Sequence, residues 1–599
     1  MNTEERRLAR WMELRTQLTE SGLSRRDAYR LGLLLGGGVL LGSGLRAPRA
    51  EAQVVQVYPN SPPTRPWIEP LPIPPTLQPV PSLNPPPRPS AHQYYTFFPA
   101  PEFYEMRVRK AKHRFHPDLP ESEIFGYEGI YPGPTIDAHY GRPYLLRIIN
   151  ELPADHKGFG IPQVITHLHN FHTAPESDGG PWDWLRPGEY KDHHYTMACA
   201  GFSDPDKVPA PYRDDYGGDI RESMNTLFYH DHRPDFTSAN VYRGLAGFCR
   251  IFDKQDTGNE QDPNPLAWRL PSGEYDIPLV IADKRFDPNT GLLFFDQFTT
   301  DGFLGDKMVV NGKVQPYLNV KRRKYRFRVL NASPSRFYRL VLRRSDKRNT
   351  AFVQVTDNGN FLQAPRTVSS LELWVADRAD IIIDFSAFPA GTVLHLSNTM
   401  EMRPDGRGSR PDKTLNPDDV ANQIIQFRVQ GGTVRDDSRI PSFFRPLPTI
   451  NLGEAVQTRL WRFNRTNGQW AINGELFDPD IDHTPARLNN PRHQVKRNSA
   501  EIWIFESVDD GWDHPVHVHM EEGVATRVDG VAISPSQLSR RDIWQLRGRG
   551  RIETFRRFRD FPDPEFSGVP PGIAGRYVMH CHNTVHEDHA MMVSFTVMP

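Results

Sequence analysis

Four pairs of histidines, each separated by one residue, are the feature of this sequence best suited to chemistry. With 22 histidines in 599 residues, roughly one such pair is expected by chance. Residues i and i+2 of a β-strand face the same side, so each pair would aim two imidazoles in one direction. Eight neutral nitrogen ligands are too many for one tetrahedral zinc ion, and imidazole suits copper well. The pairs are His167/His169, His230/His232, His517/His519 and His580/His582.

A cysteine inside the last pair indicates a second kind of site. Cys581 lies between the two histidines of that pair, so on a strand its side chain points away from both. Together with His514 and His586 it makes the two-histidine, one-thiolate set of a blue-copper centre. Met591 is placed to be the weak axial ligand, and Met592 is its competitor.

The segments that must position these side chains read as β-strands. After the N-terminal region, short β-branched or aromatic runs alternate with Gly, Pro and Asn turns, which predicts an all-β protein of β-sandwiches. Two Asn-Gly hairpin turns are predicted at residues 310–313 and 472–475. The clearest strand runs are residues 144–149, 324–330, 381–385 and 501–505.

Polar stretches at residues 253–265 and 431–446 divide the strands into three expected domains. Two histidine pairs fall in the first domain and two in the third, so their imidazoles converge only if those domains touch. The expected domains are residues 92–255, 256–435 and 436–599.

The N-terminus resembles an export signal. Arg25 and Arg26 precede an apolar run that is shorter than the roughly 20 residues of a spanning helix. Residues 1–52 are therefore interpreted as a twin-arginine-type signal peptide, with an uncleaved anchor as the alternative. Residues 53–91 are proline-rich and predict an extended linker. The protein is expected to be periplasmic or secreted, to have no membrane span in its mature form, and to be a monomer.

Composition excludes two classes of protein. A net charge of −1 argues against a nucleic-acid binder, which usually carries a basic excess. Three cysteines are too few for a disulfide scaffold. Cys199 and Cys249 could pair in an oxidising compartment or remain two buried thiols.

The motifs around the histidines resemble those of the multicopper oxidases, and the similarity covers almost the whole mature chain. Bilirubin oxidases and spore-coat-type laccases are the most similar variants. Supporting matches are YPGPTI, YRGLAGF, NGKVQPYL and ADRADIIIDF, which begin at residues 131, 242, 311 and 376. The copper motifs are residues 166–181, 226–232, 514–519 and 580–592.

The resemblance implies three cupredoxin-like Greek-key β-sandwich domains with four coppers. It assigns Asp178 and Glu587 to proton supply, although a turn-stabilising aspartate and a surface carboxylate are the simpler interpretations. The implied type 1 ligands are His514, Cys581, His586 and Met591, and the implied type 2 ligands are His167 and His517. The implied type 3 ligands are His169, His230, His232, His519, His580 and His582.

The implied reaction is one-electron oxidation of a substrate at the type 1 copper, coupled to four-electron reduction of dioxygen to water. Phenols, aryl amines and tetrapyrroles are candidate substrates, and Mn²⁺ or Cu⁺ is the alternative. With 13 methionines and no methionine-rich insert, a dedicated cuprous oxidase is less favoured. A non-catalytic exported scaffold is the alternative from another class. Residues 200–223 form an acidic insert that could shape access or bind a cation, although a solvated loop is the simpler expectation.

Overall fold

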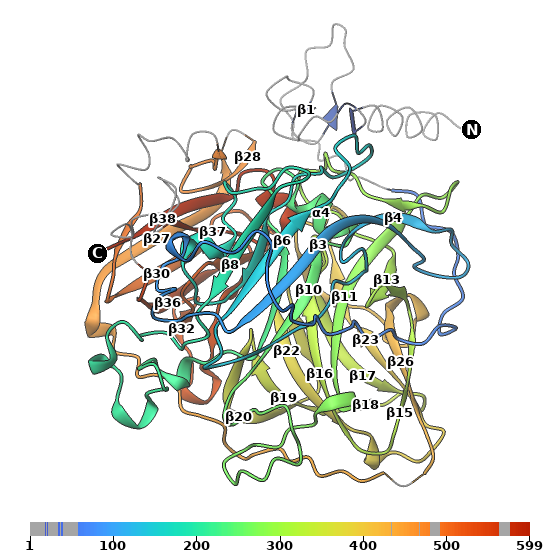
Figure 1. Ribbon diagram of the computed structural model, residues 1–599. Coiled ribbons are helices and arrows are strands. Elements are labelled where there is room, and N and C mark those ends of the chain that lie inside the picture. Colours follow the sequence, from blue (N-terminus) through green and yellow to red (C-terminus); the bar gives the residue numbers. More distant parts are fainter. Residues whose placement is uncertain are drawn as a thin grey trace, which may run out of the picture.

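The computed structural model describes residues 58–599 except 433, 467, 480–491 and 562–575, together with seven residues before 58. The signal-peptide interpretation therefore falls almost entirely outside the described residues. Most regular structure is β-strand, and the larger sheets form three pairs, each drawn from one stretch of the chain (Figure 1). None of the described helices is long and apolar enough to span a membrane.

The first sandwich packs two four-stranded sheets around an apolar core. Burial alternates along β3, where Met106 and Val108 point inward, as expected for a strand with one solvated face. One sheet has the order β4 (Ser122–Tyr127), β3 (Glu102–His113), β6 (Tyr144–Asn150), β8 (Tyr190–Tyr195). The other has the order β5 (Ile136–His139), β10 (Ala246–Phe252), β9 (Thr226–Asp231), β7 (Thr166–His169).

The second sandwich packs around a large apolar core, to which Phe327 of β16 and Leu340 of β17 contribute. Its larger sheet contains β14 (Lys313–Val314), β13 (Lys307–Val310), β11 (Asp276–Phe286), β16 (Lys324–Asn331), β22 (Arg378–Asp384), β19 (Phe352–Asp357) and β20 (Asn360–Val368), with β12 (Leu293–Phe294) beside β11. Its smaller sheet contains β15 (Tyr317–Val320), β26 (Gln423–Val429), β23 (Val393–Asn398), β17 (Tyr338–Arg344) and β18 (Asn349–Thr350), with β21 (Leu371–Leu373) beside β17.

The third sandwich has a tryptophan-rich core that includes Trp470 and Trp512. One sheet contains β28 (Gln469–Ile472), β27 (Ala455–Thr466), β30 (Ser499–Ser507), β36 (Arg551–Phe558), β32 (Gly523–Val528) and β33 (Val531–Ala532), with β34 (Arg540–Arg541) beside β32. The other contains β29 (Gln494–Lys496), β38 (Met592–Met598), β37 (Arg576–Cys581), β31 (His514–Val518) and β35 (Ile543–Leu546).

The predicted local structure is confirmed. The four strand runs fall on β6, β16, β22 and β30. At the first predicted hairpin, Val310 pairs with Lys313, and Asn311 and Gly312 both have positive φ, as a type I′ turn requires. At the second, Ile472 and Glu475 exchange backbone hydrogen bonds.

The proline-rich segment is extended, and it packs along the first two sandwiches. Pro70 forms a bridge with Tyr317 of the second sandwich, and Val80 forms one with Phe103 of the first. Its own side chains Leu71 and Leu83 are buried, and Leu71 belongs to the core of the second sandwich. Residues 58–91 therefore act as a strap along the two sandwiches.

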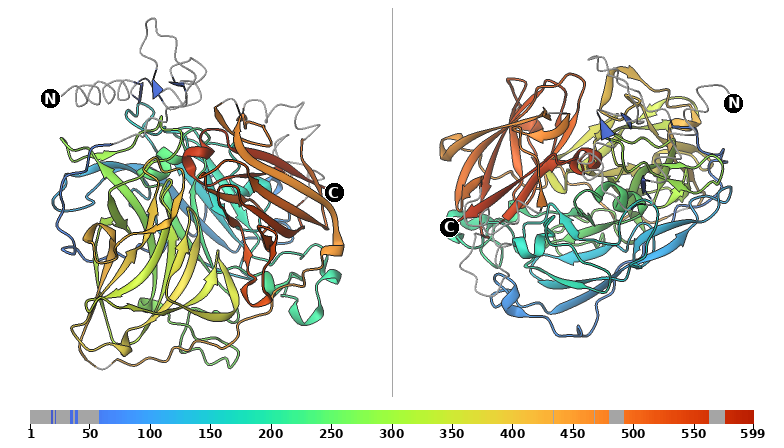
Figure 2. Two further views of the ribbon diagram at one scale, coloured as in Figure 1. Left: turned by 180° about the vertical axis from the view of Figure 1, so that it is seen from behind. Right: turned by 90° about the horizontal axis from the view of Figure 1, so that it is seen from above.

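The third sandwich lies against the first, as the view from above shows (Figure 2). Helix α7 (Thr584–Glu587) follows β37 at this boundary, and α4 (Thr237–Arg243) of the first sandwich contacts it. The first and third domains therefore touch, which the sequence required if the four histidine pairs were to converge.

Candidate metal centres

Strand register brings the histidine pairs opposite one another within each domain. Antiparallel β7 and β9 place His167 opposite His230. Antiparallel β31 and β37 place His517 opposite His580. Residues directly opposite in an antiparallel pair project to the same face, so each pair of strands presents imidazoles from both of its motifs on one face.

The two faces meet between the first and third sandwiches. The rings of His167 and His519 stack with centroids 3.9 Å apart, and those of His169 and His517 stack at 3.8 Å. All eight histidines are buried. Their nitrogen atoms form three groups, within each of which the possible ligand atoms lie within 4.8 Å of one another. These groups are His169/His230/His582, His232/His519/His580 and His167/His169/His517.

Hydrogen bonds turn one nitrogen of each of three rings away from the centre. Nδ1 of His167 contacts the Asp178 carbonyl oxygen at 2.5 Å, Nδ1 of His519 contacts Asp178 Oδ2 at 2.7 Å, and Nδ1 of His517 contacts the Asp542 carbonyl oxygen at 3.2 Å. The Nε2 atoms of these three rings are buried without a hydrogen-bond partner. A ring whose outer nitrogen is held and whose inner nitrogen is free is oriented for metal ligation.

The spacing of the inner nitrogens also fits a metal. His169 Nδ1 lies 3.4 Å from His230 Nε2, and His232 Nε2 lies 3.3 Å from His580 Nε2. Two nitrogens that each sit about 2 Å from one ion at a tetrahedral angle are about 3.3 Å apart. Burial also lowers the pKa of His230 to about 4 and that of His232 to about 3. Neutral imidazole is the form that binds metal.

A separate group forms on the other face of β31 and β37. The register places Val516 opposite Cys581, so the thiol points into the third sandwich's core, away from the histidines on either side of it. Cys581 Sγ lies 3.5 Å from Nδ1 of His514 and 3.5 Å from Nδ1 of His586. Burial raises the pKa of the Cys581 thiol, so a bound cation is needed to hold the thiolate.

The two methionines after this group point into different cores. Met591 belongs to the core that contains Cys581, and its carbonyl oxygen accepts a hydrogen bond from the Cys581 amide at 3.1 Å. Met592 lies opposite His580 in the strand register and packs in a separate cluster with Trp182. Met591 is therefore on the side of the thiolate group, and Met592 is not.

The two predicted carboxylates both contact the histidine groups. Asp178, at the end of α3 (Pro175–Asp178), contacts His519 as described, and burial raises its pKa well above the usual value. Glu587 lies with Oε2 3.2 Å from His580 Nδ1 and Oε1 3.5 Å from His232 Nδ1. Burial opposes its ionisation, but the neighbouring imidazoles outweigh burial and lower its pKa to about 2. Both carboxylates are buried, so neither simpler interpretation from the sequence describes its surroundings.

Comparisons with known proteins agree with this geometry. Residues 450–599 match the family model described as multicopper oxidase. The chain is 31% identical to a bilirubin oxidase of Albifimbria verrucaria over 91% of this chain and 84% of that protein. The chain belongs to the multicopper oxidase family. It is also 29% identical to a laccase of Bacillus subtilis, over 88% of this chain and 97% of that protein.

Solved structures show the same fold. A multicopper oxidase variant from Aquifex aeolicus superposes with a TM-score of 0.68 at 24% identity, over 89% of this chain and 100% of that one. The three sandwiches are thus cupredoxin-like. As a multicopper oxidase, the protein is an enzyme that couples oxidation of a substrate to reduction of dioxygen at copper centres, and four coppers per chain is the family standard.

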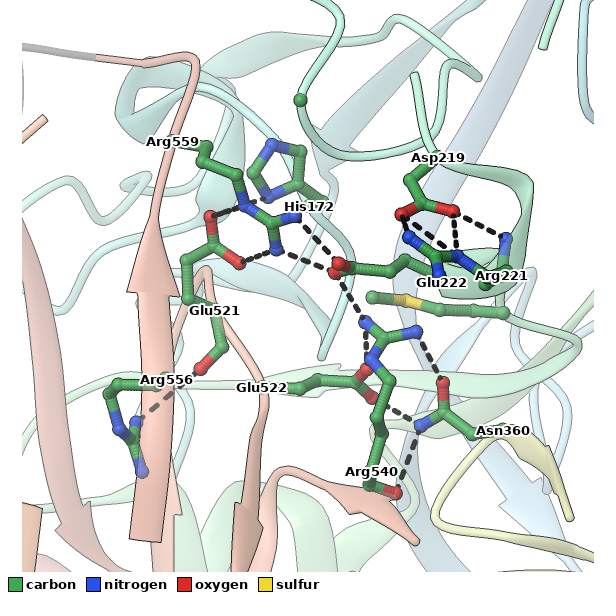
Figure 3. Close-up of polar contacts among 12 residues, drawn as sticks. His172, Asp219, Arg221, Glu222, Asn360, Glu521, Glu522, Arg540, Arg556 and Arg559 are labelled. Atoms are coloured by element: carbon green, nitrogen blue, oxygen red, sulfur yellow. Dashed lines mark hydrogen bonds and ion pairs between the residues drawn. The ribbon is translucent and has the colours of Figure 1, made fainter. Parts of the chain in front are cut away.

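The acidic insert of this multicopper oxidase is only partly the solvated loop expected from its sequence, because residues 205–215 are mostly exposed whereas residues 218–223 are buried or half-buried. Glu222 is buried and accepts hydrogen bonds from both terminal nitrogens of Arg559, at 2.6 and 2.5 Å (Figure 3). Asp219 is also buried and pairs with Arg221. Asp215 pairs with Lys254, and the amides of Cys199, Tyr216 and Gly218 donate to Asp214. The acidic side chains are thus already occupied, which argues against a cation site in the insert.

The same charged network includes residues that follow one of the copper motifs in the sequence. Glu521 and Glu522 follow His519, and their partners Arg559 and Arg540 also bind Glu222 (Figure 3). This network is defined here as the insert anchor, because it ties the insert to the third sandwich.

Two residues at the centre of the cluster were not found by sequence reasoning. Asp542 contacts both His169 and His517, and Arg378 of the second sandwich binds Asp542. The sequence signal for Asp542 was a charged Arg-Arg-Asp run before an apolar strand. Arg378 lies in the ADRADIIIDF segment, to which the sequence assigned no role. Cys199 and Cys249 are both buried and free, so the unpaired alternative holds in the structure.

Proposed function

We propose that four copper ions are held by the residues the sequence indicated. His514, Cys581 and His586 would hold the type 1 ion, with Met591 as a weak fourth ligand because it alone of the two methionines shares the thiol's core. The type 2 ion would be held by His167 and His517. One type 3 ion would be held by His169, His230 and His582, and the other by His232, His519 and His580.

When bound, the coppers supply the one-electron redox chemistry that takes electrons from a substrate and delivers four of them to dioxygen. Cys581 links the two sites, because its thiol faces one and the flanking His580 and His582 face the other. An electron passing from the type 1 ligand Cys581 to a trinuclear ligand would cross a single residue. The observation that carries the proposal is this placement of Cys581 and its neighbours on opposite faces of β37.

Reduction of dioxygen to two waters consumes four protons, and two carboxylates are positioned to handle them. Burial raises the pKa of Asp178, which favours the protonated form that can donate a proton. Glu587 has a lowered pKa, so it is an acceptor that orients the rings of His580 and His232. When two carboxylates lie beside one cluster and their pKa values shift in opposite directions, the one with the raised pKa is assigned as the acid and the other as the base.

The surroundings of the proposed type 1 centre favour an organic substrate. Trp470 packs with its ring centroid 4.1 Å from that of His586, and Trp512 lies 4.6 Å from Trp470. The Arg465 guanidinium lies 4.2 and 4.6 Å from these two indole centroids, and its side chain is 27% exposed. The two tryptophans are buried, so a substrate would meet the rim formed by Arg465 and Arg407, whose positive charge favours π-rich or anionic molecules such as phenols and tetrapyrrole carboxylates.

The carboxylates near this rim are not free to bind a metal ion. Asp301 pairs with Arg465, and Asp405 pairs with Arg407 at 3.3 Å. Among the described residues, clusters of three or more potential metal ligands occur only at the copper centres proposed above. Mn²⁺ requires several oxygen ligands, so a metal-ion substrate is the less favoured alternative.

Oxygen uptake tests this choice. We expect uptake with a dimethoxyphenol or bilirubin to exceed that with Mn²⁺ at least about tenfold, since Coulomb repulsion from the arginine rim disfavours cations. Arg407→Glu should reduce uptake with anionic bilirubin and raise that with Mn²⁺. Predominantly Mn²⁺-dependent uptake by the unmodified protein would replace the organic substrate with a metal ion.

We also propose export as a folded monomer by the twin-arginine route, on the strength of Arg25 and Arg26 before the apolar run. Replacing both arginines by lysine should leave the protein in the cytoplasm of an expressing bacterium. Appearance of the variant in the periplasm at the normal level would refute this route.

A further inference from the structure

Asp542 is a second buried aspartate, besides Asp178, that contacts ligands of two proposed copper sites. Asp542 directly precedes β35 and is fully buried. Its Oδ2 lies 2.6 Å from Nε2 of His169, while its carbonyl oxygen lies 3.2 Å from Nδ1 of His517. Asp542 thus holds one proposed type 3 ligand through its side chain and one proposed type 2 ligand through its backbone.

The contact with Asp542 makes His169 differ from the neighbouring histidines in which of its ring nitrogens is hydrogen-bonded. Nε2 of His169 donates to Asp542, so the lone pair that remains for a metal is on Nδ1, which lies 3.4 Å from His230 Nε2. The rings of His167 and His519 have the opposite arrangement, with Nδ1 held outside and Nε2 free. Which ring nitrogen ligates is decided by the hydrogen bond that the other makes.

An arginine from the middle sandwich holds this carboxylate. Arg378 of β22 is fully buried, and its Nη1 donates to Asp542 Oδ2 at 3.0 Å and to the Ala376 carbonyl oxygen at 3.0 Å. Its Nη2 donates to the Asn358 carbonyl oxygen at 3.1 Å. The backbone contacts fix the guanidinium, and the guanidinium offsets the cost of burying a carboxylate beside two imidazoles.

We propose that Asp542, held in place by Arg378, is a positioning residue that makes His169 ligate through Nδ1 and aligns His517 beside it. The middle sandwich supplies none of the proposed copper ligands, yet through Arg378 it controls how firmly the trinuclear site retains copper. This inference rests on the ligand assignment proposed above.

The experiment compares Asp542→Asn and Arg378→Gln with a matched control, Arg541→Gln. Arg541 is adjacent in sequence and pairs with Asp377 of the middle sandwich at 3.2 Å, and none of its ion-pair or hydrogen-bond partners is a histidine. The copper-loaded proteins are titrated with a chelator. Copper per chain, the type 2 electron paramagnetic resonance signal and the blue absorption of the type 1 site are followed together.

Both cluster variants should keep the blue absorption and lose trinuclear copper at chelator concentrations about 10–100-fold lower than the unmodified protein does, the usual effect of losing a partner of a metal ligand. In Asp542→Asn, the amide oxygen can still face both His169 and Arg378, because both contact Oδ2, so this variant tests the loss of the negative charge. The control should match the unmodified protein.

Equal chelator resistance in all four proteins would overturn the inference, and so would an equal loss in Arg541→Gln, which would indicate general loosening of the domain boundary. Asp542→Asn is isosteric, so its result stands if Arg378→Gln does not fold. Failure of the proposed function is distinguishable, because the unmodified protein would then bind no trinuclear copper at all.

Discussion

Replacing Glu587 by glutamine should separate the two halves of the catalytic cycle. The carboxylate lies close to two imidazoles, with Oε2 3.2 Å from His580 Nδ1 and Oε1 3.5 Å from His232 Nδ1. The amide of glutamine has one acceptor, and its NH₂ group must face the other ring's N–H. Loss of one charge-assisted hydrogen bond is worth about 1.5–3 kcal/mol, or about a 10–100-fold change in rate. Because glutamine also cannot transfer the proton, we expect the rate of reoxidation to fall at least about 100-fold.

The assay is sequential-mixing stopped flow. Anaerobic mixing with a phenol reports reduction of the type 1 site from bleaching of its blue absorption, and a second mix with oxygen reports reoxidation. Reduction should be unchanged, because Glu587 contacts trinuclear and not type 1 ligands, while reoxidation should slow at least about 100-fold. Asp588→Asn is the matched control, since the neighbouring carboxylate binds Ser238 of α4. Unchanged reoxidation, or equal slowing of both phases, would refute the reasoning.

Two further predictions concern stability. Glu222→Gln removes one of the two carboxylate partners of Arg559 in the insert anchor and should cost about 3–5 kcal/mol, as loss of one member of a buried pair does. The more exposed Glu454→Gln should cost under about 1 kcal/mol, and equal losses in thermal midpoint would contradict the anchor. Burial opposes ionisation of Asp436, but Lys324 outweighs it and lowers the pKa to about 2, so this carboxylate stabilises the fold above about pH 4 and loses that effect as pH falls toward 2. Asp436→Asn should lower the thermal midpoint by about 2 °C at pH 6 and by less than about half of that at pH 2.5, and a pH-independent difference would be inconsistent with the shift.

Local features of the fold could be predicted because they depend on neighbouring residues. The run at β16 and the Asn311-Gly312 turn are examples, since backbone preference and burial alternation decide both. The histidine pairs could be recognised because a two-residue spacing has a direct meaning on a strand. Cys581 is the same case, since its position between two histidines already implies two faces.

Contacts between domains could not be predicted in the same way. Asp542 reaches His169 across 373 positions of sequence, and nothing near either residue indicates the other. The acidic insert was misjudged for the same reason, because Glu222 finds its partner Arg559 only when the first and third sandwiches are together. The strap of residues 58–91 has a composition typical of a free linker, and only the surfaces of the two sandwiches determine that it packs.

Copper content and visible spectrum test the central claim most directly. Purified, copper-loaded protein should contain about four coppers per chain, and it should show an intense blue thiolate-to-copper absorption that Cys581→Ser abolishes while trinuclear copper remains. Colourless protein that takes up no copper, or a blue absorption that survives Cys581→Ser, would contradict the account.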